Sequence, residues 1–157
     1  MPDLNQLVIL SIDEHQYALQ LCDIERIVRM VEITPLPKAP EIVMGVINVQ
    51  GRIIPAVNIR SRFGLPLREI DMNDQLIIAH GSKLWIALLV DRVSGVMAYQ
   101  DYEVTKVADI FPGIEYVKGI IKKENSLILI LDIDIILSSH EITSMDDAIL
   151  KITEGMT

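Results

Sequence analysis

Two groups of carboxylates in this sequence have spacings that could support acid–base chemistry or hold a cation. Asp132 and Asp134 are two residues apart, so a β-strand would point both toward one face, as an acid–base pair or a metal clamp requires. We favour a structural role instead, in which the strand turns into a helix and Asp134 caps it. The segment 71–74, Asp-Met-Asn-Asp, offers oxygen ligands but lacks the glycine and distal glutamate of a calcium loop, so it is typical of a polar linker.

The potential nucleophiles lack the bases that would activate them. The three histidines are His15, His80 and His140, and we interpret the first two as solvated or hydrogen-bonded side chains. Cys22, the single cysteine, is typical of a small core hydrophobe. The segment 138–141, Ser-Ser-His-Glu, contains the residue types of a triad, but neighbours in sequence do not form a triad by proximity alone. The sequence thus predicts no catalytic residue, no metal and no cofactor.

Composition excludes several classes of function. The 157 residues carry a formal net charge of −8, which does not supply the basic surface needed to bind nucleic acid or an anionic membrane. The longest apolar run, Leu84–Val90, is far shorter than the roughly 20 residues of a membrane-spanning helix. The first residues lack the features of a secretory signal, and one cysteine fits a reducing compartment. We therefore expect a cytoplasmic protein with no nucleic-acid partner and no direct membrane insertion.

The elements that must position these residues are mainly strands. Short apolar bursts rich in β-branched residues and flanked by turn formers lie at 7–10, 17–21, 53–57 and 127–131. Three prolines between 35 and 40 keep that stretch extended. Within 22–28, by contrast, Ile24, Ile27 and Val28 have the i, i+3, i+4 spacing of a short helical turn. The sequence predicts a mainly β fold.

The two halves of the chain are similar to each other. When the chain is aligned with itself so that Leu7 lies over Leu76, Ile24 lies over Val93 and Ile27 over Val96 without a gap. Further along, after a short insertion in the second half, Gly45 lies over Gly119, Ile53 over Leu127 and, at a turn, Gly51 over Asn125. Glycine and asparagine best tolerate the positive φ of a tight hairpin turn. A duplicated unit of roughly 60 residues explains this agreement.

A single unit of this size is marginally stable, so we expect the two to pack together. We predict two small β-barrels that share one core interface, with subdomain one at about 7–65 and subdomain two at about 76–137. A helical tail over about 133–154 follows, with Ser144 as its N-cap and Gly155 at its end. Its apolar stripe, which can lie on the barrels, consists of Met145, Ala148, Ile149 and Ile152.

With no active site predicted, the function must come from surfaces. The hairpin at 45–55 contains Pro55, which cannot donate to a ladder and favours an edge strand or a bulge. We expect Ile24 and Ile27, with their copies Val93 and Val96, where the barrels approach each other. An aliphatic crevice there would fit a partner helix. Two alternatives remain: these residues are simply core, or the crevice holds a small apolar ligand in a sensor module.

Three segments resemble CheW-like chemotaxis coupling proteins. They are the hairpin Gly45–Arg60 with the Phe63-Gly64 that follows it, the segment Ile33–Pro40 and the segment Ala87–Val96. The likeness runs from about residue 5 to about residue 140, in the family's order and spacing. It implies two interlocked, SH3-like, five-stranded β-barrels related by the internal repeat, with a short C-terminal helix.

The resemblance also implies a non-catalytic adaptor. Such a scaffold would couple the cytoplasmic hairpin tip of a chemoreceptor to the regulatory domain of a CheA-type histidine kinase, in chemotaxis or a related pathway. Receptor helices would enter the groove between the barrels, and exposed barrel ends would pair with kinase barrels. The residues that match the family's partner-binding positions are Ile24, Ile27, Gly45, Asn48, Gly51, Val93 and Val96. At Gln50 the family usually has arginine, whose charge-assisted, bidentate pairing an amide cannot reproduce.

Overall fold

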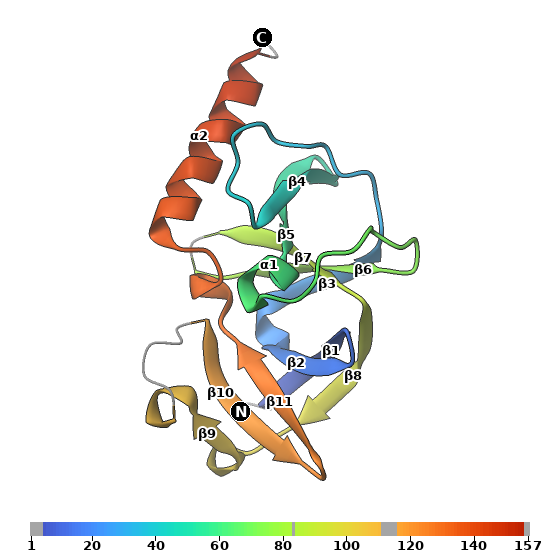
Figure 1. Ribbon diagram of the computed structural model, residues 1–157, viewed down its shortest axis with the longest axis vertical. Helices are drawn as coiled ribbons and strands as arrows, with labels where there is room; N and C mark the ends of the chain where they lie inside the picture. The colour runs from blue at the N-terminus through green and yellow to red at the C-terminus, as the bar shows by residue number, and fades with distance from the viewer. Residues whose placement is uncertain (1–4, 83, 111–115, 156–157) are drawn as a thin grey trace.

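The computed structural model describes residues 5–82, 84–110 and 116–155 (Figure 1). Its strands are β1 (Gln6–Ile12), β2 (His15–Gln20), β3 (Ile24–Arg29), β4 (Val43–Val49), β5 (Arg52–Asn58), β6 (Gln75–His80), β7 (Trp85–Val90), β8 (Arg92–Ala98), β9 (Val104–Lys106), β10 (Val117–Lys123) and β11 (Ser126–Leu131). The α-helices are α1 (Ile59–Phe63) and α2 (Ser139–Gly155), and the 3-10 helices are η1 (Leu21–Asp23), η2 (Asp101–Glu103), η3 (Val107–Asp109) and η4 (Ile133–Ile135). The predicted mainly β fold is confirmed.

The strands form two sheets that exchange elements between the halves of the chain. One sheet has six strands in the order β8-β1-β2-β11-β10-β9, and the other has five in the order β3-β6-β7-β5-β4. Parallel pairing of β2 with β11, and of β5 with β7, joins strands that are far apart in sequence. Each sheet therefore contains strands from both repeats, at about 7–65 and 76–137.

The internal repeat is visible in the strand registers. The hairpin β1–β2 has its counterpart in β6–β7, and β4–β5 in β10–β11. Irregularities occur at equivalent places: β3 has one extra residue at Glu25, and β8 has one at Ser94, which is the repeat-related position. A bulge inserts one residue and strengthens the local twist, so both strands bend alike as they enter the other sheet.

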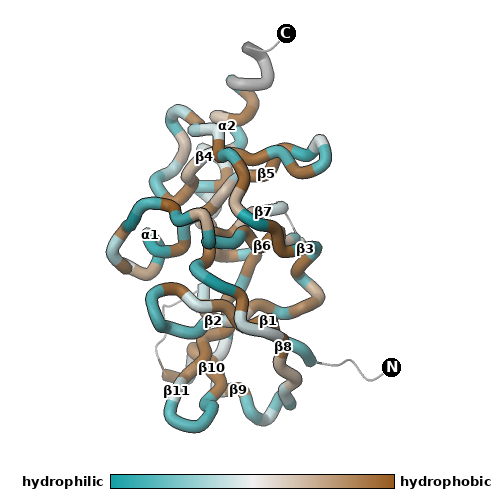
Figure 2. Tube along the Cα trace, turned by 90° about the vertical axis from the view of Figure 1, so that its right-hand side faces the viewer, coloured by the Kyte–Doolittle hydropathy of each residue, from teal (hydrophilic) through white to brown (hydrophobic). Residues whose placement is uncertain are grey.

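Three apolar clusters hold the sheets together. One cluster lies within the six-stranded sheet and includes Ile9, Ala18 and Ile128. A second lies within the five-stranded sheet and includes Ile54 and Leu76. The largest draws buried residues from strands of both sheets, from η4 and from α2. Figure 2 shows hydrophobic colour along the strands and hydrophilic colour at many of the turns. The two units thus share one core interface, as predicted.

The helical turn predicted over 22–28 is wrong. Only Leu21–Asp23 forms a 3-10 turn, and Ile24, Ile27 and Val28 lie on β3, which pairs with β6. The bulge at Glu25 breaks the two-residue alternation of a strand, and this break produced the helix-like spacing of the apolar residues. The equivalents Val93 and Val96 lie on β8.

The tail differs from the prediction at both of its caps. Asp132, not Asp134, caps η4, because its Oδ1 accepts from the Asp134 N–H at 3.0 Å. Helix α2 begins at Ser139, where Ser138 and Glu141 bond to each other's backbone N–H groups as a capping box. Ser144 therefore lies inside the helix. The predicted apolar stripe of α2 is confirmed for Met145 and Ala148, which are buried, and for Ile149, which packs against the shared core. The side chain of Ile152 lies outside the described residues.

Candidate partner-binding surface

The β4–β5 hairpin ends in a two-residue turn. Val49 pairs with Arg52, and between them Gln50 and Gly51 both have positive φ, 51° and 85°, as a type I′ turn requires. The Asn48 Oδ1 accepts from the Gly51 N–H at 2.8 Å and fixes the turn from inside the strand. Gln50 is consequently held exposed at the end of the hairpin. We refer to Asn48, Gln50 and Gly51 as the hairpin tip.

Gly45 has a positioning role at the base of this hairpin. Thr34 and Val46 exchange two backbone hydrogen bonds, of 2.9 and 2.8 Å, which bring the segment before the prolines against β4. A Cβ at Gly45 would overlap the Thr34 carbonyl oxygen, so only glycine permits this approach. Gly45 is buried and presents no side chain to a partner. Pro55 lies on β5, which is flanked by β4 and β7, rather than on the predicted edge, and β7 pairs with β5 only from Ala56 onward.

A cluster of aromatic and cationic side chains next to the hairpin was not predicted. The Arg52 guanidinium lies 4.1 Å from the centroid of the Trp85 ring, and the His80 ring lies 4.4 Å from the same residue's ring at 57°. The cation–π contact contributes about 0.5–1 kcal/mol at an exposed site. Ile53, next along β5, is half exposed. The five-stranded sheet therefore has polar, cationic and apolar groups close to the hairpin tip.

The four aliphatic residues from the predicted crevice lie on two repeat-related strands. Ile24 on β3 and Val93 on β8 are partly buried and pack against the shared core. Ile27 and Val96 are 39% and 57% exposed. Figure 2 places β3 and β8 on the same side of the molecule, one from each sheet. We refer to these four residues as the β3–β8 strip.

The eight predicted site residues therefore do not form one cluster. The hairpin tip extends from β4, which is one edge of the five-stranded sheet, whereas β3 is the opposite edge. Ile27 and Val96 are exposed on the β3–β8 strip, and Gln50 is exposed at the hairpin tip. Gly45 is buried behind the hairpin. The result is two separate surfaces, one aliphatic and one mainly polar.

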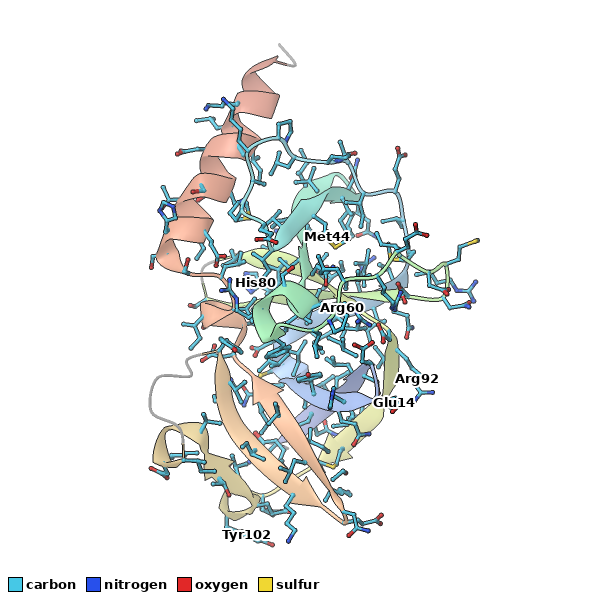
Figure 3. All side chains as sticks on the ribbon, in the orientation of Figure 1. Glu14, Met44, Arg60, His80, Arg92 and Tyr102 are labelled. Carbon is cyan, nitrogen blue, oxygen red and sulfur yellow. The ribbon has the colours of Figure 1, made fainter. Side chains whose placement is uncertain are left out.

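A network of ion pairs holds β8 in place, and no local sequence pattern predicted it. We refer to Asp13, Arg60, Arg68, Asp74 and Asp91 as the Asp91 network. Its central cation is buried: the Nη2 of Arg60 lies 2.8 Å from Asp13 and 3.0 Å from Asp91. Figure 3 shows Arg60 in the middle of the molecule. The network joins the β1–β2 turn, helix α1 and the residue just before β8.

The linker between α1 and β6 is fastened to the same network. Arg60 donates through Nη1 to the carbonyl oxygen of Pro66 at 3.0 Å. Arg68 lies 2.6 Å from both Asp74 and Asp91. Asp74 is only 3% exposed and also accepts from the Asp71 N–H, so the segment 71–74 is a structural clamp rather than a plain polar linker. No group of three or more potential ligands for a metal occurs among the described residues.

These contacts shift the ionisation of the Asp91 network. Burial raises the pKa of the Asp91 carboxyl, but the Asp13 N–H and the guanidiniums of Arg60 and Arg68 lower it by more, so its pKa lies below the ordinary value. The hydrogen bond to Asp74 is the largest cause of the raised pKa of Arg68. Asp91 and Arg68 therefore remain charged at neutral pH, and their contacts hold the crossover into β8.

The predicted nucleophiles have other environments. Cys22 is exposed, so its prediction as a core residue is wrong. His15, His80 and His140 are exposed, and His80 contacts Trp85. Ser138 and Glu141 cap α2, and Glu141 also pairs with Arg62. No helix within the described ranges is long and apolar enough to cross a membrane.

A cavity of about 580 Å³ lies beside the six-stranded sheet. Its lining includes Ser11, Glu14, His15 and Arg92 as well as Leu127 and Leu129. Figure 3 shows Glu14 and Arg92 close together on one side of the molecule. The charged and hydroxyl groups in this lining do not suit a small, wholly apolar ligand. Because the cavity is lined by one sheet alone, the alternative of an apolar ligand between the barrels stays a prediction.

The geometry of two sheets, a shared core and a glycine-dependent hairpin can be compared with known proteins. The CheW-like domain model matches residues 6–141 of this chain. The chain belongs to the CheW-like family. It is 38% identical over 140 residues to the chemotaxis protein CheW of Thermotoga maritima, a match that covers 88% of this chain and 89% of that protein. It is 27% identical over 146 residues to the chemotaxis protein CheW of Treponema pallidum, with coverages of 89% and 86%.

A solved structure from the CheW-like family has the same fold. The crystal structure of the scaffolding protein TtCheW from Thermoanaerobacter tengcongensis superposes with a TM-score of 0.77 at 26% identity, covering 88% of this chain and 95% of that one. The predicted membership of the CheW-like family is confirmed, and the chain is a chemotaxis scaffold of this family.

Proposed function

We propose that this CheW-like protein is a non-catalytic cytoplasmic scaffold that couples a chemoreceptor to a CheA-type histidine kinase. The observation that carries the proposal is the separation of two exposed surfaces: the hairpin tip extends from β4 at one edge of the five-stranded sheet, whereas the β3–β8 strip lies on the opposite edge, β3, and on the edge strand β8 of the six-stranded sheet. Two partners can therefore bind at once without competing for the same residues. Each contact can then bias the geometry of the other, which is the basis of coupling.

The chemistry of each surface supports one partner. The exposed aliphatic side chains of the β3–β8 strip suit the apolar face of a helix, so we assign it to the hairpin tip of the receptor. The hairpin tip is mainly polar and lies at one end of its sheet, so we assign it to the regulatory domain of the kinase. Two contacts at the small end of the range for specific interfaces would give modest affinities that strengthen in an array.

Calorimetry with the two partners tests this assignment. The full chain is titrated with the regulatory domain of a CheA-type kinase and, separately, with a receptor hairpin fragment. Ile27→Glu and Val96→Glu place a charge on the β3–β8 strip and should weaken receptor binding by tenfold or more, about 1.4 kcal/mol, with kinase binding unchanged. Leu150→Glu changes an equally exposed apolar residue on α2 and is the matched control. Loss of both affinities in one strip variant, or binding to neither partner, would overturn the proposal.

Gln50 provides a test of the hairpin tip. If a carboxylate of the kinase faces this position, Gln50→Arg adds a charge-assisted hydrogen bond and should tighten kinase binding by about ten- to a hundredfold, or roughly 1–3 kcal/mol. Receptor binding should not change, because Gln50 is remote from the β3–β8 strip. Equal affinities of the two forms for several kinases would contradict a kinase contact at Gln50.

A further inference from the structure

Gln75, the first residue of β6, contacts strands of both sheets. Within the five-stranded sheet it is paired with Arg29 of β3 on one side and with Val90 of β7 on the other. Its side-chain Oε1 accepts from the Val93 N–H of β8 at 2.8 Å, and β8 belongs to the six-stranded sheet. One residue therefore links β3 to β8, the two strands that carry the β3–β8 strip.

The other half of the chain satisfies the equivalent amide without a side chain. The repeat-related positions of Gln75 and Val93 are Gln6 and Ile24. The Ile24 N–H donates to the carbonyl oxygen of Leu21, at the end of η1. In the second half, the described chain passes from β7 into β8 without such a 3-10 turn (Figure 1). The Gln75 side chain therefore takes the place of a backbone acceptor that this crossover lacks.

The residue before Gln75 is held firmly. Asp74 is 3% exposed, and its two carboxylate oxygens accept from the guanidinium of Arg68 at 3.0 and 2.6 Å. Such a two-pronged pair fixes direction as well as distance. Arg68 also reaches Asp91, just before β8. The Asp91 network and the Gln75 hydrogen bond thus fix the start of β8 at two points, Asp91 and Val93.

The start of β8 matters because the β3–β8 strip is drawn from two sheets. Ile27 lies on β3 and Val96 on β8, so hydrogen bonds within one sheet do not set the spacing between these exposed side chains. Between Val93 and Val96, the pairing of β8 with β1 is interrupted by the bulge at Ser94, and a bulge bends its strand. The hydrogen bond from Gln75 holds β8 directly before this bend.

We propose that Gln75 is a positioning residue for the β3–β8 strip. Its side chain holds the start of β8 relative to β3, so that Ile27 and Val96 face a receptor helix in a fixed arrangement. This inference rests on the proposed function, because it takes the strip as the receptor site. A surface arranged in advance loses less conformational freedom when it binds. Without the Gln75 acceptor, receptor binding weakens, whereas the hairpin tip, which extends from the opposite edge strand β4, is unaffected.

The test uses the full chain, labelled with ¹⁵N. Gln75→Met removes the acceptor but keeps the length of the side chain, and it should speed hydrogen exchange of the Val93 amide by about tenfold or more. In calorimetry, it should weaken binding of the receptor hairpin fragment by about three- to tenfold and leave binding of the kinase regulatory domain unchanged. Gln75→Glu keeps an acceptor oxygen at the same distance along the side chain and should restore both properties.

Gln6→Met is the matched control. It changes the repeat-related glutamine, where the Ile24 N–H already has the Leu21 carbonyl as its acceptor, so Val93 exchange and both affinities should stay unchanged. Unchanged Val93 exchange in Gln75→Met would overturn the positioning role. An equal loss of both affinities would also overturn it, because it would indicate a general loss of structure.

Ile27→Glu distinguishes this inference from the proposed function. If Ile27→Glu weakens receptor binding and Gln75→Met does not, the strip is the receptor site and the positioning role of Gln75 is wrong. If neither variant weakens receptor binding, the strip is not the receptor site, and both proposals are wrong.

Discussion

The two places where the chain crosses between the sheets are related by the repeat, but different chemistry holds them. Before β8, Asp91 binds Arg60, Arg68 and the Asp13 N–H. The repeat-related positions of Asp13, Asp91 and Arg60 are Ser82, Cys22 and Asp134. There, Asp134 accepts from the Ser82 N–H at 2.6 Å and from its hydroxyl at 3.0 Å, while Cys22 is exposed.

This difference distinguishes the geometry that both crossovers share from the additional contacts that the charged side chains make. Both crossovers lead into a strand with the same bulge, so that geometry does not require an ion-pair network. The charged crossover additionally fastens the 64–74 linker through Pro66 and Arg68. We infer that the Asp91 network fixes the linker and β8 together. The contact of Asp134 with Ser82, by contrast, fixes only the turn between β6 and β7 against η4.

Removing Arg60, the central cation of the Asp91 network, should destabilise the crossover before β8 and give the largest decrease in stability. Arg60→Met leaves Asp13 and Asp91 without their shared guanidinium. A fully buried pair loses about 3–5 kcal/mol on such a change, and because both carboxylates are partly exposed we expect a decrease of about 2–4 kcal/mol in the free energy of unfolding. Urea denaturation measures it. Arg52→Met, which removes an exposed cation, is the control and should cost less than about 1 kcal/mol. A loss below that value for Arg60→Met would show that the network is not needed for stability.

Acidification should weaken the same crossover. The pKa of Asp91 in the folded protein lies below its ordinary value, so the unfolded chain binds the proton more readily. The contribution of Asp91 is therefore complete above the unfolded carboxyl pKa of about 3.9 and is lost as pH falls through the lower folded pKa. Asp91→Asn should cost about 1–3 kcal/mol at neutral pH. Urea unfolding at several pH values should show the gap to the unchanged protein narrowing in acid, and a gap that widens would contradict the assignment.

The two crossovers also show which features a sequence can reveal. The strands, the duplicated halves and the β4–β5 hairpin were predictable because alternation, turn residues and glycines act locally. The exchange of strands between sheets was not, because the pairing of β5 with β7 joins residues about 30 positions apart. Asp13 and Asp91 are 78 positions apart, and no local pattern links them to Arg60.

The errors at the candidate site have equally specific physical causes. The bulge at Glu25 gave β3 the apolar spacing of a helix. At the tail, Ser144 and Ser138 are both followed three residues later by an acidic side chain, and only the structure shows that Ser138 is the cap. The contacts of Arg52 and His80 with Trp85 depend on cross-strand neighbours, which a single sequence does not identify.

A glycine substitution should test the contact between Asp134 and Ser82, with a smaller effect. A Cβ at Gly81 would overlap Asp134 Oδ1, so Gly81→Ala should displace that carboxylate from Ser82 and cost about 1–2 kcal/mol. In an Asp134→Ala background the same change should be nearly neutral, because the displaced group is gone. A double-mutant cycle by urea denaturation measures the coupling. Additive losses would show that Asp134 does not hold the turn.

The smallest effect should come from the two repeat-related hairpin turns. Gln50 and Glu124 occupy equivalent positions in the two turns, with φ of 51° and 52°. Glu124 directly precedes Asn125, the residue that the repeat aligns with Gly51. Left-handed backbone is costly for long side chains and tolerated by asparagine and glycine. Gln50→Asn and Glu124→Gly should each stabilise the protein by about 0.5 kcal/mol. Thermal unfolding measures both. The backbone strain is the same in both turns. If Glu124→Gly raises the stability of the protein while Gln50→Asn lowers it, the Gln50 side chain makes a stabilising contact within the free protein. That result would argue against the availability of Gln50 to a partner.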